Sequence, residues 1–123
     1  MNNFGYNATA VALIPTDTIS TTTTGSAIDL VEYDGEAAVI LNCGAGGIGA
    51  TCDVKLTHSD TSGGSYTDVS GAAFTQVGNA ASHQKISINT NEMKQFVKAV
   101  CTVAGVASFE IAVSLVAVKK YLP

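Results

Sequence analysis

The chain has 123 residues, a length that suits one domain with a single modest core. Only 13% of the residues are charged, against roughly 25% in typical soluble domains, so the chain exposes neutral polar surface, buries surface against partners, or does both. The net charge is −4, and all six basic residues are lysines. Arginine supplies most bidentate contacts to bases and phosphates, so this composition argues against nucleic-acid binding.

Targeting signals are not evident in the sequence. No apolar run reaches the roughly 18 residues that predict a membrane span, and the first 15 residues lack the basic group that opens a secretion signal. We therefore expect synthesis and folding in a cytoplasm and no contact with a membrane.

Valine, isoleucine and threonine supply 35 of the 123 residues, a composition typical of β structure. The first 25 residues are polar and rich in threonine, and Asp17 is their only charge. We expect 1–25 to form an extended N-terminal arm that pairs outside its own domain. Residues 26–123 then form a single all-β domain, an antiparallel β-sandwich or jelly-roll-like fold.

Strand-like segments follow one another at short intervals along the domain. Asp34–Gly35 is a hairpin turn signal between the first two, and 36–43 is apolar on both faces, which predicts a central strand. The predicted strands are 26–34, 36–43, 50–59, two short strands within 65–78, 83–91, 93–103 and 107–121. Alternation predicts these inward side chains: Cys52, Val54, Leu56, Ile86, Ile88, Val97, Ala99, Cys101, Val103, Phe109, Ile111, Val113 and Leu115.

The segment 58–71 contains the residue types of a hydrolytic triad. His58, Ser59 and Asp60 are consecutive, however, and neighbours in a strand point to opposite faces, so they cannot converge on one proton path. The only other histidine is His83. The Asp, Ser and Gly residues that follow are typical of a turn, and we predict the loop of a β-hairpin.

The glycine cluster 44–49 looks like part of a dinucleotide fingerprint. That motif requires a following helix, whereas the next residues have the pattern of a strand. A metal site is disfavoured because Asp29 and Glu32 lie on opposite faces of an extended segment and only two imidazoles are present. We expect no cofactor, no metal, no small-molecule substrate and no enzymatic activity.

Three cysteines, Cys43, Cys52 and Cys101, form neither a disulfide framework nor a zinc signature. Cys43 and Cys52 flank the glycine cluster and could face each other in a bridge. A cytoplasmic origin favours free, buried thiols that act as small apolar side chains.

A resemblance to a known class rests on ordered short phrases across roughly 36–121. The chain resembles small virion structural proteins of tailed bacteriophages in four phrases that follow one another. These are "VKLTHSDTSGGSYTDV", "FTQV", "ISINTNEMKQFVKAV" and "TVAGVASFEIAVSLVAVKKY". Within that class the chain is most similar to capsid decoration, or cement, proteins.

The resemblance implies a β-sandwich on the capsid surface of a virion assembled in the host cytoplasm. Its partners would be the major capsid protein and copies of itself, as a trimer or dimer. Strand addition by the arm would then join neighbours, and the arm's anchors would be Phe4, Tyr6, Val11, Leu13 and Ile14.

Other functions stay open at this point. A tail-tube or head–tail connector subunit is also structural, and the net charge of −4 does not exclude it because a tube lumen that passes DNA is often acidic. A carbohydrate-binding β-sandwich is disfavoured because the chain has no tryptophan and only four tyrosines to stack on sugars. A small enzyme is disfavoured by the missing catalytic constellation.

Overall fold

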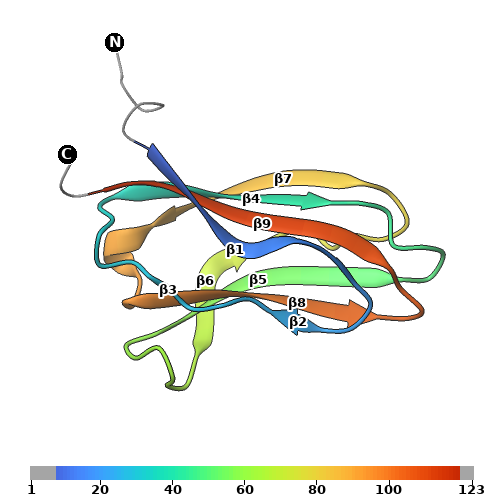
Figure 1. The fold of residues 1–123 in the computed structure, drawn as a ribbon, viewed down its shortest axis with the longest axis horizontal. Helices are drawn as coiled ribbons and strands as arrows, with labels where there is room; N and C mark the ends of the chain where they lie inside the picture. Colours follow the sequence, from blue (N-terminus) through green and yellow to red (C-terminus); the bar gives the residue numbers. More distant parts are fainter. Residues whose placement is uncertain (1–7, 120–123) are drawn as a thin grey trace, which may run out of the picture.

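The computed structural model describes residues 8–119, which fold into two antiparallel β-sheets packed face to face (Figure 1). No helix within this described part is long and apolar enough to cross a membrane. The elements are β1 (Ala8–Ile19), β2 (Thr23–Thr24), β3 (Ile28–Asp29), β4 (Glu36–Cys43), β5 (Thr51–Ser59), β6 (Thr67–Ala73), β7 (Ser82–Asn89), the 3-10 turn η1 (Thr90–Glu92), β8 (Phe96–Ala104) and β9 (Phe109–Val118).

The strand order is that of a jelly roll. One sheet runs β1-β9-β4-β7, and the other runs β2-β8-β5-β6 with β3 pairing farther along β8. The pairs are nested: β1 lies beside β9, β2 and β3 beside β8, β4 beside β7, and β5 beside β6. This pairing defines the double-sheet jelly roll, so the predicted fold class is confirmed.

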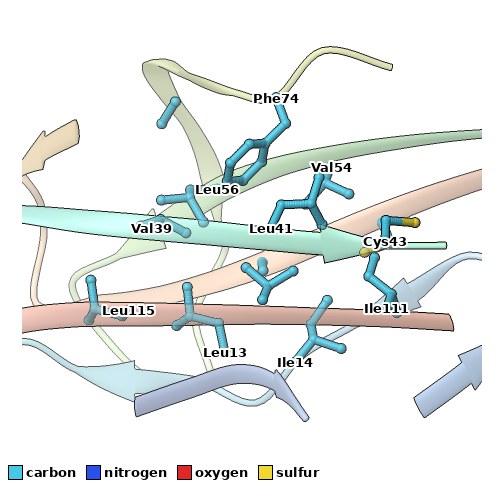
Figure 2. Close-up of a cluster of buried hydrophobic side chains, with 14 of the residues drawn as sticks. Leu13, Ile14, Val39, Leu41, Cys43, Val54, Leu56, Phe74, Ile111 and Leu115 are labelled. Atoms are coloured by element: carbon cyan, nitrogen blue, oxygen red, sulfur yellow. The ribbon is translucent and has the colours of Figure 1, made fainter. Parts of the chain in front are cut away.

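The core fills the space between the sheets, and the strands alternate as their sequence predicts. Cys52, Val54 and Leu56 of β5 are at most 2% exposed, and the inward residues of β9 are at most 1% exposed. Figure 2 shows how side chains from both sheets meet. Strand β4, between β9 and β7, occupies the central position that its apolar sequence predicts.

The N-terminal segment differs from the expected arm. Strand β1 pairs with β9 from Ala8↔Val118 to Ile19↔Phe109, so residues 8–19 belong to the sandwich. The pairing register is broken between Ala12 and Ile14 and again between Ile14 and Asp17. The second break contains Pro15, which lacks a backbone donor and is tolerated in such an irregular edge strand. Leu13, Ile14 and Ile19 of β1 are buried beside the inward residues of β9, so β1 closes this edge of the core.

Two other segments also differ from their predicted form. Only Ile28–Asp29 of 26–34 is a strand, and it pairs with β8, so Asp34–Gly35 turns the chain from one sheet to the other instead of closing a hairpin. Segment 65–78 forms one strand, β6. Phe74 and Val77 follow it as buried residues, and Val77 makes a single bridge to Cys52.

Candidate functional site

Four connections gather at one end of the sandwich, the right-hand end in Figure 1: residues 20–22, 44–50, 74–81 and 105–108. We call this the loop end. It exists because nested antiparallel strands turn together at each end of the jelly roll.

Backbone hydrogen bonds join three of these connections, 44–50, 74–81 and 105–108, to one another. Gly46 is central: its N–H donates to the carbonyl of Gly78 (3.1 Å), and its carbonyl accepts from the N–H of Ser108 (3.2 Å). A Cβ at Gly46 would overlap the ring of Phe109, so only glycine lets the chain pass this close. The glycine-rich connection is thus held in place, although its composition alone suggests flexibility.

Two large apolar side chains project from these held loops. Ile48 is 93% exposed and Val106 is 96% exposed, and their loops adjoin, since a Cβ at Gly47 would lie 3.8 Å from the carbonyl oxygen of Val106. Single exposed apolar residues are ordinary on protein surfaces. Two such residues on adjoining, hydrogen-bonded loops form a small apolar patch that a partner protein can bury. The sequence carries one signal for this pair, a β-branched residue beside glycine in each turn, which the alternation of apolar residues along strands does not reveal.

A second surface feature is the outer side of the β1-β9-β4-β7 sheet, whose centre carries no charge. We call this the uncharged face. Each of its members points away from the core and is at least partly exposed: Ala8, Ala10, Ala12, Ala38, Ile40, Ala112, Ser114, Val116 and Val118. Glu36, Glu110, His83 and Lys85 lie around it.

A hollow of about 490 Å³ opens where this face reaches the loop end. Its polar lining includes Thr16, Ser82, Glu110, His83 and Asn42. The Nδ1 atom of His83 is hydrogen-bonded to the Oδ1 atom of Asn42. The second histidine, His58, lies at the opposite end, where its Nδ1 accepts from the N–H of Lys94 (3.2 Å). The structure therefore does not bring the two imidazoles together.

The loop prediction for 58–71 is confirmed. Strands β5 and β6 are antiparallel neighbours, and residues 60–66 connect them. The Ser59 hydroxyl accepts from the N–H of Thr61 (3.3 Å), and the Tyr66 hydroxyl donates to the carbonyl of Ser62 (2.8 Å). These side chains stabilise the turn itself.

All three cysteines are free thiols buried in the core, as expected for small apolar side chains. Burial raises the pKa of the Cys43 thiol to about 11. The hydrogen bond with Cys52, together with burial, raises the pKa of Cys101. These two thiols stay protonated at neutral pH and are poor nucleophiles.

The predicted arm anchors have different positions. Phe4 and Tyr6 lie outside the described residues. Leu13 and Ile14 are 1% and 3% exposed in the chain's own core, so they are not free to anchor on a neighbour, and Val11 packs against that core while partly exposed. The core needs these residues because they cover β9 from the edge of the sheet.

Comparison with known proteins gives structural likeness only. No protein-family model matches the chain, and no curated protein sequence matches it. The SPBc2 prophage-derived protein YomS superposes with a TM-score of 0.58 at 13% identity, covering 91% of this chain and 93% of that one.

Two structures of infectious bursal disease virus are also similar. The VP2 subviral particle gives a TM-score of 0.54 at 15% identity over 91% of this chain, and the Gt strain gives 0.56 at 13% over 89%. The chain spans 32% and 30% of those viral proteins. At such identities these likenesses establish one thing, that the chain shares its β-sandwich fold with a prophage protein and with proteins of viral particles.

Proposed function

We propose that this chain is a virion structural protein that binds the capsid exterior of a phage and stabilises contacts between major capsid subunits. The observation that carries the proposal is the loop end, where hydrogen-bonded loops hold Ile48 and Val106 almost fully in solvent. The fold supports it too, since similar structures include a prophage-derived protein and proteins of viral particles.

The mechanism is mechanical. Burying an isoleucine or valine side chain against a partner contributes about 1.5–3 kcal/mol. Loops that are already held in place lose little conformational entropy on binding. A few such contacts are weak individually, but the same contacts repeated over a capsid lattice act together and oppose separation of the subunits.

The test is binding of the purified chain to phage particles that lack it, followed by cryo-electron microscopy. We expect density on the capsid exterior at positions that follow the lattice symmetry. Substituting Ile48→Asp and Val106→Asp places charge on the contact and should reduce binding at least about tenfold, which corresponds to about 1.4 kcal/mol.

The matched control is Val31→Asp. Val31 is 56% exposed and lies in the connection between β3 and β4, at the opposite end of the sandwich. It should leave binding unchanged. Density confined to the tail or portal would instead favour a tail-tube or connector subunit. No binding to particles would reject both roles and direct the search to glycan binding.

A further inference from the structure

The two sheets present very different outer surfaces. On the β2-β8-β5-β6 sheet, charged groups already have partners: Lys55 Nζ lies 2.9 Å from Asp68, and Lys98 Nζ lies 4.4 Å above the ring centre of Tyr66. Asp53 accepts from the side-chain amide of Gln76 (3.0 Å). This sheet has the polar surface of a solvated face.

The uncharged face is built differently, and the pairing register shows it row by row. One row across the sheet is Ala10, Val116, Ala38 and Ser87, and the next is Ala12, Ser114, Ile40 and Lys85. Three of the four strands contribute only small or apolar side chains to these rows. Small side chains leave a flat surface that a second sheet can approach to the ordinary spacing of about 10 Å.

We propose that two copies of this chain associate through the uncharged face, related by a two-fold axis. Such an interface is isologous, so each copy uses the same patch. The centre of the patch has no charge to repel its copy, although each chain carries a net charge of −4. The surrounding residues carry both signs, since Lys85 is positive and Glu36 and Glu110 are negative. Opposite charges on the two copies can therefore face each other around the rim.

The area of the face agrees with a reversible dimer. Strands rise about 3.4 Å per residue and lie about 4.8 Å apart, which gives the whole outer side of this four-stranded sheet, its charged rim included, roughly 600 Å². Two copies would bury about 1,200 Å² in total, the lower end of the range for specific interfaces. We therefore expect association that depends on concentration.

Sedimentation velocity of the whole chain over a wide concentration range tests this proposal without any capsid. The wild-type chain should shift from monomer to dimer as its concentration rises. Ser114→Lys, at the centre of the uncharged face, should weaken association at least about tenfold, because two lysines would be buried against each other.

The matched control is Thr102→Lys. Thr102 is also a hydroxyl residue on a central strand, but it faces outward on the other sheet beside Asp53. It adds the same charge and should leave the dimer unchanged. Thermal unfolding of both variants shows whether each has folded.

A second variant reports on proximity directly. Ala10→Cys adds an exposed thiol to a chain whose own cysteines are buried, so a short bifunctional maleimide should join two copies at this position. Thr102→Cys should give no such product. A chain that stays monomeric, or a dimer that Ser114→Lys leaves intact, would overturn the proposal. Neither result depends on capsid binding, which is measured separately on particles.

Discussion

At the scale of single residues, the three cysteines of the core act as small apolar side chains although a thiol is chemically reactive. Cys43 comes from one sheet, and Cys52 and Cys101 come from the other, and the three are buried together. Their hydrogen bonds and burial favour the neutral thiol at Cys43 and Cys101. Ionising these groups should therefore oppose folding.

This gives a prediction for stability against pH. The pKa of Cys43 is raised from 9.0 to about 11 in the folded chain, so its contribution to stability is complete below pH 9 and is lost as pH rises from 9 to 11. Burial also raises the pKa of Tyr33, which adds to the loss at high pH. Urea unfolding from neutral pH to pH 11 should show the decline.

The control for this prediction is Cys43→Ala, which has no thiol to ionise at that position. It should be less stable than wild type at neutral pH because a packed sulfur atom is gone. The difference in unfolding free energy should then narrow as pH rises. A difference that stays constant to pH 11 would contradict the role given to Cys43.

At the scale of secondary-structure elements, β1 is the strand that places residues 8–19 within the sandwich. It forms one edge of its sheet through its pairing with β9, and Leu13 belongs to the buried core cluster (Figure 2). The register breaks between Ala12 and Asp17 give the edge an irregular form, which also discourages a further strand from adding there.

Leu13→Ala tests whether β1 is part of the fold. Because the side chain is 1% exposed, its truncation should lower the free energy of unfolding by about 2–5 kcal/mol. Ala12→Ser, on the exposed outer side of the same strand, should change it by less than about 0.5 kcal/mol. If urea titrations show that both substitutions change the free energy of unfolding by the same small amount, β1 contributes little to stability, as expected for a free arm.

At the scale of the whole molecule, the nested pairing makes the first and last strands neighbours. Strand β9 lies between β1 and β4, so the edge formed by residues 8–19 cannot separate without breaking its pairing with β9 and exposing its own buried side chains. Residues 23–24 are tied to the second sheet through β8. We infer that residues 8–119 form one cooperative unit.

Hydrogen exchange under increasing denaturant checks this inference. Amides of β1 should lose protection together with those of β5 and β8, in a single transition. The exposed loop 60–66 should exchange early and provides the internal comparison. Loss of protection in β1 well before β5 would instead divide the chain into an arm and a domain.

Much of this fold follows from the sequence. Alternation of apolar and polar residues predicted the inward side chains of β5 and β9, the continuous apolar run predicted the central place of β4, and turn residues predicted the loop before β6. Each of these properties is local, because a strand's period of two residues sets which side chains share a face.

Only the tertiary structure decided which strands are neighbours, because pairing joins segments far apart in the chain. The polar, threonine-rich composition of residues 1–25 suggests an arm, yet β1 has a partner at the far end of the sequence. The adjacency of Ile48 and Val106 and the uncharged face likewise combine residues from separate strands and loops. The sequence determined that this protein is built of strands, and the nested pairing of those strands determined which surfaces it offers to partners.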